Sequence, residues 1–427
     1  MERYQVQGGL PLVGTVKVGG AKNSILPVLA AALLNESREE IRLQQVPALG
    51  DVRAMLSILR CLGARVDQEG EDLLLQTADV DCDHVPDALM REMRSSIFLM
   101  GPLLGRLGRV RISYPGGCAI GLRPINLHLE GLQQLGAVIE EKGGCIEARG
   151  RLRGGEVTLA YPSVGATENL MLAAVCARGS TVINNAACEP EIADLQNFLN
   201  MLGARVSGAG SPVIRIRGVR GLHGGSYRVF PDRIVAGTFL LAAVLTRGCV
   251  TVEEVIPEHF ASLTKLLEEA GAEVERGAAA VTVRAAEPLR ALSRVKTGPY
   301  PGFPTDLQPQ LLAALTLADG SSTIIEHVFK GRFHHVPELR KMGARIELSG
   351  HRAVIRGVRR LSGAAVQATD LRAGAALTLA ALAADGESTI AGIGHIERGY
   401  DGLPEALARL GGRISREKSV PEEVLSS

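Results

Sequence analysis

A short phrase built around a glycine recurs six times in this 427-residue chain. The copies are LGARV, LGAVI, LGARV, AGAEV, MGARI and LGGRI, and their first glycines are Gly63, Gly136, Gly203, Gly271, Gly343 and Gly411. Successive glycines are 73, 67, 68, 72 and 68 residues apart. A nearly constant period of this kind indicates a repeated structural unit. The sequence therefore predicts six copies of one unit of about 70 residues.

Each copy follows an amphipathic segment, for example residues 51–61 and 191–201, and precedes a short run of β-forming residues. Glycine suits the left-handed position just after a helix, so the phrase marks the end of a surface helix and the start of a strand. A second kind of segment precedes each surface helix. It is apolar nearly all round and rich in Ala, as at 166–179 and 369–386, which is typical of a buried helix. The expected unit is α/β: buried helix, strand, surface helix, glycine, strand.

Six such units predict two domains of three, because a chain of this length exceeds one ordinary hydrophobic core. The glycine-containing crossing at 223–233 is the expected boundary. The opening strand, residues 4–18, precedes the first buried helix, and a closed three-fold domain needs it to complete the last unit. We therefore predict domain one at 22–230 and a discontinuous domain two at 1–21 and 231–427.

Composition excludes several classes of function. The formal net charge is +1, which gives no electrostatic reason to expect nucleic acid or an anionic membrane as a partner. The first residues lack the apolar segment of a signal peptide, and the long aliphatic stretch at 373–384 is too short to cross a membrane. The seven cysteines are odd in number and form no C-x-x-C pair, which indicates reduced thiols. We predict a cytoplasmic protein with no membrane insertion.

The starts of the predicted buried helices are polar. They carry Lys22-Asn23, Arg94, Ser163-Val164-Gly165, Asp232-Arg233, Asp306 and Asp370-Leu371-Arg372. An Asp at a helix start can cap free backbone N–H groups or serve a ligand, so both interpretations of Asp306 and Asp370 stay open. Cations oppose the helix dipole at this end. The positions of Lys22, Arg94 and Arg372 therefore predict a ligand with several negative groups.

The loop YPGGCAIGLRP, residues 114–124, is the most unusual in the chain. Its glycines allow the backbone to approach a ligand closely or to move as a lid. Cys118 stands five residues before Arg123, so its thiol is expected to be more exposed and more acidic than a core thiol. The equivalent loops of other units carry Glu189, Arg332 and Arg398. Cys118 is therefore the predicted reactive group.

Other cysteines and a histidine pair have simpler interpretations. Cys61, Cys176 and Cys249 lie in apolar runs, so we predict that they belong to the core. His334 and His335 are adjacent, but no Cys or carboxylate stands beside them at the spacing of metal ligands. We expect this pair at the surface or in a loop, and we predict no metal site.

Segments that match a known family run from end to end of the chain. They are GGAKNSILP, PGGCAIGLRP, PSVGATEN, CEPEI, FPDRIVAGTF, YPGFPTDLQPQ, RFHHVPELRKMGARI, ATDLRAG and HIERGYDGL. In these segments the chain resembles the UDP-N-acetylglucosamine 1-carboxyvinyltransferases of the enolpyruvyl transferase family. The resemblance implies a two-domain inside-out α/β barrel, in which two pseudo-three-fold domains have buried helices inside and sheets outside. In that family the active site lies between the domains.

The resemblance also implies an activity, the transfer of the enolpyruvyl group of phosphoenolpyruvate to the 3′-hydroxyl of UDP-N-acetylglucosamine with release of phosphate. This is the first committed step of peptidoglycan synthesis, and so of cell wall biogenesis, cell shape and cell division. No metal or organic cofactor is implied. Two alternatives stay open: a transferase of the same fold with another acceptor, such as shikimate 3-phosphate, and a catalytically weak or inactive paralogue. The Cys118 loop and PSVGATEN argue against the first. The second is opposed by the intact residues Lys22, Cys118, Asp306 and Arg398.

Roles known in the family carry over to matching positions. Cys118 is implied to be the general acid or covalent partner for phosphoenolpyruvate and the thiol that fosfomycin alkylates, and Asp306 the base for the 3′-hydroxyl. Lys22, Arg123 and Arg398 are implied to hold phosphate and carboxylate groups, with Lys22 aiding proton transfer. The other implied substrate contacts are Asn23, Arg94, Pro124, Ile125, Asn126, Leu127, Ser163, Val164, Gly165, Val328, Arg332, Asp370 and Arg372.

Several positions depart from the family pattern. Asn126 stands in place of an Asp on the uracil side, and Glu397 replaces an Asp beside Arg398. Lys330-Gly331 replaces Glu-Asn, and His334 replaces a Met. The departures point to one of the two paralogues that some bacteria carry.

Overall fold

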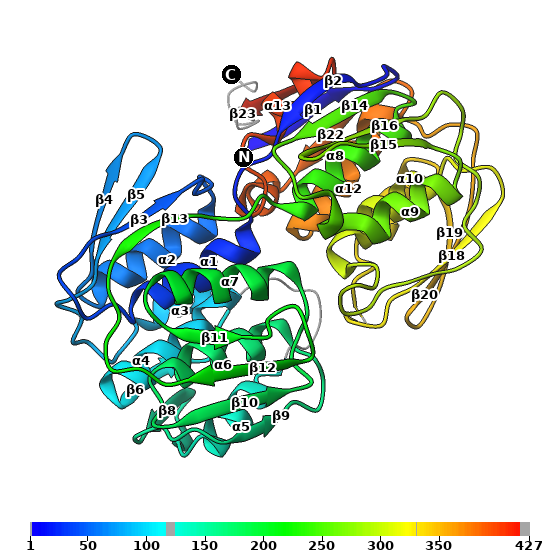
Figure 1. Ribbon diagram of the computed structural model, residues 1–427. Helices are drawn as coiled ribbons and strands as arrows, with labels where there is room; N and C mark the ends of the chain where they lie inside the picture. Colours follow the sequence, from blue (N-terminus) through cyan, green and yellow to red (C-terminus); the bar gives the residue numbers. More distant parts are fainter. Residues whose placement is uncertain (1, 117–123, 330, 419–427) are drawn as a thin grey trace. The chain divides into compact units, whose positions relative to one another are not determined.

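The computed structural model describes residues 2–116, 124–329 and 331–418, and these divide into two compact lobes (Figure 1). Lobe one comprises the described residues from 19 to 230, and lobe two comprises residues 2–18 and those from 231 to 418. Each lobe has its own hydrophobic core. The chain enters lobe one earlier than residue 22, because the Ala21 N–H donates to the Phe230 carbonyl oxygen at 2.7 Å within that lobe.

The strands of each lobe belong to three sheets in the described part of the chain. The strands of lobe one are β3 (Ile41–Gln44), β4 (Arg65–Glu69), β5 (Asp72–Gln76), β6 (Arg109–Ser113), β7 (Val138–Lys142), β8 (Cys145–Arg149), β9 (Glu156–Thr158), β10 (Ser180–Asn184), β11 (Arg205–Ser207), β12 (Val213–Arg217) and β13 (Gly225–Arg228). The strands of lobe two are β1 (Glu2–Gln7), β2 (Val13–Lys17), β14 (Cys249–Glu253), β15 (Glu273–Arg276), β16 (Ala280–Arg284), β17 (Val295–Lys296), β18 (Ser321–Ile325), β19 (Arg345–Ser349), β20 (Arg352–Arg356), β21 (Ala365–Gln367), β22 (Glu387–Ala391) and β23 (Arg413–Lys418).

Five of these six sheets have the same four-stranded topology, and the sixth has three strands. The orders are β13-β3-β5-β4, β11-β12-β10-β9, β15-β16-β14-β2, β17-β18-β20-β19, β21-β22-β1-β23 and β6-β8-β7. In each four-stranded sheet one edge strand pairs in parallel with the strand that follows a buried helix, and the remaining pairs are antiparallel. In the three-stranded sheet a single parallel bridge between His84 and Arg111 stands at the corresponding edge. The repeated unit predicted from the glycine period is therefore a repeated sheet with its helices.

The opening segment supplies two strands rather than one, and they lie in different sheets. β1 lies between β22 and β23 and is antiparallel to both, with Tyr4 opposite Ile390 and Arg416. β2 pairs in parallel with β14. Lobe one is completed in a similar way, because β13, which lies in the crossing at 223–233, pairs in parallel with β3. Each lobe is thus completed by a strand from a distant part of the chain.

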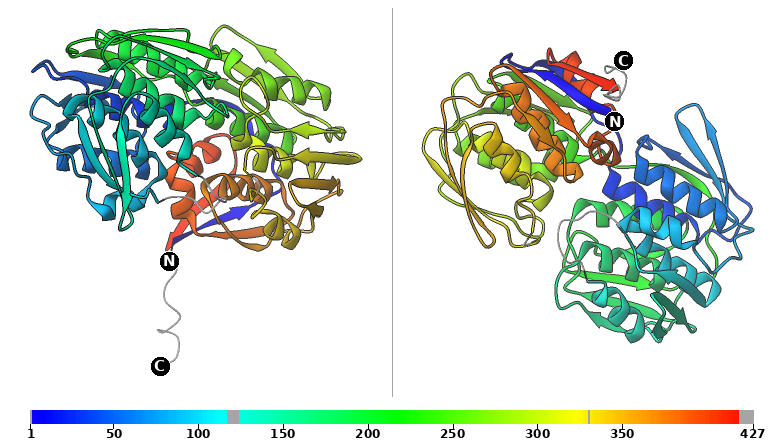
Figure 2. Two further views of the ribbon diagram at one scale, coloured as in Figure 1. Left: turned by 90° about the horizontal axis from the view of Figure 1, so that it is seen from below. Right: turned by 180° about the vertical axis from the view of Figure 1, so that it is seen from behind.

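The buried helices begin where the sequence places polar residues. They are α1 (Lys22–Ala32), the 3₁₀ helix η1 (Arg94–Leu99) continued by α4 (Met100–Leu107), α6 (Val164–Val175), α8 (Arg233–Leu245), η3 (Thr305–Leu307) continued by α10 (Gln308–Leu315), and α12 (Leu371–Ala383). Small side chains let them pack closely: a Cβ on Gly101 of α4 would lie 2.4 Å from the Asn169 carbonyl oxygen of α6. In Figures 1 and 2 the sheets of each lobe lie outside its buried helices.

The surface helices end at the repeated glycines. They are α2 (Gly50–Cys61), α5 (Asn126–Gln134), α7 (Pro190–Met201), η2 (Pro257–Phe260) with α9 (Ala261–Glu269), α11 (Val336–Lys341), and η4 (Ile393–Arg398) with α13 (Leu403–Arg409); α3 (Asp87–Glu92) is a further short helix. All six repeated glycines have φ between 94° and 105°, the left-handed region that glycine adopts without strain. The predicted helix ends are confirmed.

Two further observations concern helix length and the cysteines. Among the described residues no helix is both long and apolar enough to cross a membrane. Cys61, predicted to be in the core, is exposed, because it occupies the outward side of the last turn of α2, and Cys176 and Cys249 are only partly buried. The six described cysteines are free.

Candidate active site

Three aspartates stand at the starts of the buried helices of lobe two, and only two of them cap. The Asp232 carboxylate accepts from the backbone N–H groups of Ile234 and Val235 at 2.8 and 3.0 Å. Asp370 likewise accepts from the N–H groups of the second and third residues after it, at 2.9 and 3.0 Å. The Asp306 carboxylate oxygens instead contact the side chains of Arg332 and Arg372. The capping interpretation therefore holds for Asp370, and Asp306 has another role.

The Asp306 carboxylate lies between two buried guanidinium groups. Its Oδ1 is 2.8 Å from Nη1 of Arg332, and its Oδ2 is 2.8 Å from Nη2 of Arg372. The Arg332 and Arg372 side chains are 4% and 2% exposed, whereas the Asp306 side chain is 23% exposed. Burial by itself raises the pKa of Asp306, but Arg372 and then Arg332 outweigh it and hold that pKa well below its usual range. Asp306 is an ionised carboxylate that still reaches solvent.

Each of the two arginines is also held against an aromatic ring. The Arg372 guanidinium carbon lies 5.4 Å from the ring centroid of Tyr400, and that of Arg332 lies 5.5 Å from the ring of Phe329. Nε of Arg332 and Nη1 of Arg372 are buried and have no hydrogen-bond partner among the described residues. Within the described part of the chain, two buried guanidinium donors are thus left unsatisfied beside the partly exposed carboxylate, an exception to the usual pairing of buried polar groups.

His335 lies next to this cluster, and together with His334 it belongs to the turn before α11, as expected for a loop. It is 1% exposed, whereas His334 is exposed, because α11 begins just after the pair and turns His335 inward. Burial, and then the charge of Arg332, lower the pKa of His335 to about 4, against an opposing effect of Asp370. His335 is therefore neutral near pH 7 and adds no further positive charge to the two arginines.

Lys22, the first residue of α1 in lobe one, has a partner that the sequence analysis missed. Its Nζ lies 2.7 Å from Oδ2 of Asp51, and both side chains are buried, at 10% and 7% exposed. Asp51 belongs to the first turn of the surface helix α2. One sequence signal could have pointed to Asp51. It stands where a surface helix begins, and the functional loops predicted in other units stand at the same place.

The predicted nucleotide-binding residues of lobe one lie together. Residues 124–127 lead into the first turn of α5, and the side chain of Ser163 caps α6 by accepting from the Ala166 N–H at 3.4 Å. A Cβ on Gly165 would lie 3.2 Å from Cε1 of Phe98 and 3.3 Å from Cε1 of His128. The starts of α5 and α6 are therefore in close contact, and a larger residue at position 165 would require these rings to shift. The helix starts of α5 and α6 form one surface of partly buried and exposed residues.

The remaining predicted residues are divided between the lobes. Lobe one also carries Asn23 and Arg94, each at the start of a helix. Lobe two carries Val328, in the segment between β18 and α11, and Arg398, at the end of η4. Glu397, one of the departures from the family pattern, pairs with Arg416 at 3.2 Å. Cys118 and Arg123 lie outside the described residues, as does Lys330.

Glu168, in the second turn of α6, is a buried carboxyl group that no prediction included. It is 1% exposed, and neither carboxyl oxygen has a hydrogen-bond partner among the described residues. Burial, with the charges of Glu191 and Glu189, raises the pKa of Glu168 well above its usual value. A carboxyl group in such surroundings is more easily protonated in the folded than in the unfolded chain.

We therefore expect Glu168→Gln to stabilise the protein at neutral and higher pH. A raised pKa in the folded state means that full stability exists below the unfolded-state pKa, near 4.3, and is lost as pH rises towards the folded pKa. The variant should be more stable by about 1–3 kcal/mol at pH 8, and the difference should shrink towards pH 4. Urea denaturation at pH 4, 6 and 8 measures this, and a difference that does not change with pH would contradict it.

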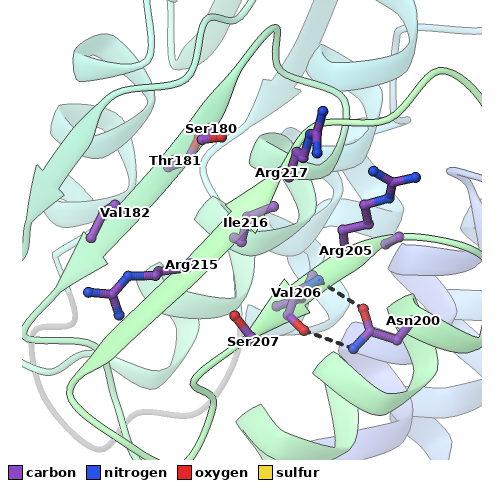
Figure 3. Close-up of a pocket in the computed structure, with 11 residues that line it drawn as sticks. Ser180, Thr181, Val182, Asn200, Arg205, Val206, Ser207, Arg215, Ile216 and Arg217 are labelled. Atoms are coloured by element: carbon purple, nitrogen blue, oxygen red, sulfur yellow. Dashed lines mark hydrogen bonds between the residues drawn. The ribbon is translucent and has the colours of Figure 1, made fainter.

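A hollow of roughly 550 Å³ on the outer face of lobe one is a different surface from the candidate site (Figure 3). It is lined by Ser180, Thr181, Val182, Asn200, Ala204, Arg205, Val206, Ser207, Arg215, Ile216 and Arg217. None of these is a predicted site residue. In Figure 3 Arg205 and Arg217 lie side by side, and Arg215 extends the other way. The hollow is open and basic, and no carboxylate is among its lining residues, so it lacks a group comparable to the ionised Asp306.

Comparison with known proteins places this arrangement in context. A family model described as EPSP synthase (3-phosphoshikimate 1-carboxyvinyltransferase) matches residues 6–407. UDP-N-acetylglucosamine 1-carboxyvinyltransferase 1 of Symbiobacterium thermophilum is 54% identical over 422 residues, which cover 97% of this chain and 95% of the relative. UDP-N-acetylglucosamine 1-carboxyvinyltransferase 2 of Carboxydothermus hydrogenoformans is 52% identical over 419 residues, covering 97% and 99%.

Two solved structures share the fold of this chain. The enolpyruvyl transferase NikO from Streptomyces tendae has a TM-score of 0.87 at 26% identity and covers 98% of this chain and 99% of its own. EPSP synthase from Acinetobacter baumannii has a TM-score of 0.76 at 18% identity, covering 98% and 100%, which supports the fold alone. The predicted fold class is confirmed, although in the described residues the strands form separate sheets rather than one closed barrel.

Proposed function

The chain belongs to the UDP-N-acetylglucosamine 1-carboxyvinyltransferases of the enolpyruvyl transferase family, and we propose that it transfers the enolpyruvyl group of phosphoenolpyruvate to the 3′-hydroxyl of UDP-N-acetylglucosamine. The observation that carries the proposal is the 54% identity to a relative of that name over 97% of the chain. The ionised Asp306 between two buried arginines, and the cationic helix start at Lys22, are consistent with it. The product belongs to peptidoglycan synthesis.

The chemistry requires an acid that protonates phosphoenolpyruvate and a base that accepts the proton of the sugar hydroxyl. C3 of phosphoenolpyruvate gains a proton, which makes C2 electrophilic, and the sugar 3′-oxygen attacks C2 and loses its own proton. The resulting tetrahedral phospho-ketal then loses C3's extra proton and phosphate to restore the enol ether. We assign the acid, or a covalent partner, to Cys118, and the base to Asp306. Lys22, Arg123 and Arg398 would hold the phosphate and carboxylate groups.

The geometry of Asp306 limits how it can act as a base. Because Arg372 and Arg332 hold its pKa well below the usual range, the carboxylate cannot remove a proton from a free sugar hydroxyl. It can accept a hydrogen bond from that hydroxyl and orient it. Once the C–O bond forms, the oxygen becomes far more acidic, and transfer to even a weakly basic carboxylate is then favourable. Asp306 would therefore take the proton during bond formation.

The proposal also covers the roles of the two lobes and the cellular location of the protein. The residues that we assign to uridine and diphosphate belong to lobe one, and Asp306, Val328, Arg332, Asp370 and Arg372 belong to lobe two. We propose that the two lobes are the two domains of the enzyme and that both contribute to substrate binding. The free state of the six described cysteines supports a cytoplasmic location.

A phosphate-release assay with two acceptors tests the function. With phosphoenolpyruvate present, UDP-N-acetylglucosamine should support turnover and shikimate 3-phosphate should not. Turnover with shikimate 3-phosphate but not with UDP-N-acetylglucosamine would contradict the proposed acceptor. Binding of UDP-N-acetylglucosamine without any phosphate release would favour the inactive paralogue instead.

A further inference from the structure

Glu326, directly after β18 in lobe two, is a buried carboxylate that the proposed chemistry does not use. It is 1% exposed. Oε1 accepts hydrogen bonds from the Thr297 hydroxyl at 2.7 Å and from the backbone N–H groups of Val328 and Phe329 at 2.8 and 3.0 Å. Oε2 accepts from the Thr305 hydroxyl at 2.9 Å. Four donors converge on one buried side chain, so its position is tightly defined.

One side of Glu326 holds the segment that contacts the proposed acceptor. Val328 is an expected contact of the sugar, and its N–H is oriented by Glu326. The next N–H, that of Phe329, is held by the same oxygen, and the Phe329 ring lies 5.5 Å from the Arg332 guanidinium. Glu326 thus fixes the backbone from which the Phe329 side chain extends to Arg332.

The other side of Glu326 leads to Asp306. The Thr305 hydroxyl has a single proton, which it donates to Glu326, so its lone pairs are left to accept from Nη1 of Arg332 at 3.1 Å. That same Nη1 lies 2.8 Å from Oδ1 of Asp306. The direction of the Thr305 hydroxyl therefore depends on Glu326, and the place of Arg332 against Asp306 depends on that hydroxyl.

We propose that Glu326 is a positioning residue for the acceptor sugar. It orients Val328 directly, and it orients Arg332 against Asp306 through Thr305 on one side and Phe329 on the other. The inference rests on the proposed function. The competing interpretation is that Glu326 only stabilises the fold, in which case its loss lowers stability and leaves the kinetic constants of the folded enzyme unchanged.

Two variants separate these interpretations. Thr305→Val removes the hydroxyl that joins Glu326 to Arg332. Glu326→Gln keeps the shape and can keep the Oε1 bonds, but it replaces the Oε2 acceptor with a donor, so the Thr305 hydroxyl must turn away from Glu326. The structure also offers a matched control, Thr316→Val. Thr316 is 0% exposed, its hydroxyl donates to the Ala313 carbonyl at 2.6 Å, and it stands at the other end of α10.

The kinetic constants of the folded variants give the decisive readout. Thr305→Val and Glu326→Gln should lower kcat/KM for UDP-N-acetylglucosamine about 10- to 100-fold, the range for losing a hydrogen bond to a charged group. KM for phosphoenolpyruvate should change little, and Thr305→Ser, which restores the hydroxyl, should recover the lost activity. Thr316→Val should lower the unfolding temperature as much as Thr305→Val does while retaining native kinetic constants.

Several outcomes would overturn the inference. Native kcat/KM in Thr305→Val or Glu326→Gln, or equal losses in Thr305→Val and Thr316→Val, would reduce Glu326 to a structural role. Failure of Thr305→Ser to recover activity would do the same. If the native enzyme itself releases no phosphate with UDP-N-acetylglucosamine, the proposed function fails. Circular dichroism and thermal unfolding verify that each variant is folded before its rates are compared.

Discussion

Replacing Cys118 with alanine should lower turnover by about 100- to 10,000-fold and leave binding of UDP-N-acetylglucosamine nearly unchanged. The thiol is the group assigned to protonate or bond phosphoenolpyruvate, and it is not among the residues assigned to the nucleotide sugar. Phosphate release measures the first effect, and isothermal titration with the nucleotide sugar measures the second. A loss confined to kcat identifies an interaction made in the reaction and not in ground-state binding.

Cys61→Ala is the matched control for this variant. Cys61 is an exposed thiol at the end of α2 and belongs to no assigned site, so its removal should leave both measurements at native values. Cys176 supplies the contrasting case, since burial raises the pKa of its thiol to about 12 and makes it unreactive near neutral pH. An alkylating reagent should therefore inactivate the native protein and Cys61→Ala alike. Full turnover in Cys118→Ala would refute the assigned role.

The repeated fold could be predicted because its signals are local and periodic. The left-handed conformation after a surface helix depends only on the φ angle of the glycine itself, and all six glycines adopt it as predicted. The buried helices carry an equally local signal, apolar residues on every side. The crossing strands were harder to predict in detail. The single opening strand expected at 4–18 is two strands, since β1 and β2 pair with partners in different sheets.

The contacts of the charged residues could not be predicted in the same way. Arg372 and Asp306 are 66 positions apart in the sequence, and Lys22 and Asp51 belong to two different helices. Neither pair therefore leaves a local pattern in the sequence. The two interpretations of an Asp at a helix start also look identical in the sequence. They separate in the structure because Asp370 directly precedes the α-helix α12, whereas Asp306 lies within the 3₁₀ turn before α10. There the Asp306 carboxylate turns to the arginines instead of the backbone.

Asp306→Ala should combine a loss of activity with a loss of stability, because it removes the only carboxylate that contacts both buried arginines in the described residues. Leaving Arg332 and Arg372 without it should lower the free energy of unfolding by about 2–4 kcal/mol, less than for a fully buried pair because Asp306 is 23% exposed. Turnover should fall about 100- to 10,000-fold through loss of the base. Urea denaturation and phosphate release measure the two effects separately.

The surface pair of Glu268 and Arg276 provides the control for charge removal. Glu268→Ala breaks an exposed pair with a 2.7 Å contact in the same lobe and should cost at most about 1 kcal/mol, with native turnover. A cost for Asp306→Ala no larger than that of Glu268→Ala would contradict the arrangement of Asp306 between two buried cations.

Asp306→Asn separates the charge from the shape. The pKa of Asp306 is depressed in the folded state, so its ionisation stabilises the native protein fully above the unfolded-state pKa near 3.9, and that contribution is lost as pH falls below it. The stability difference between the native protein and Asp306→Asn should therefore be largest above about pH 5 and should narrow towards pH 2. Since Asn can still accept a hydrogen bond from the 3′-hydroxyl but cannot hold its proton, binding of UDP-N-acetylglucosamine should survive better than turnover. Equal losses of binding and turnover would mean that Asp306 serves only to hold the sugar, and the base would have to be sought elsewhere.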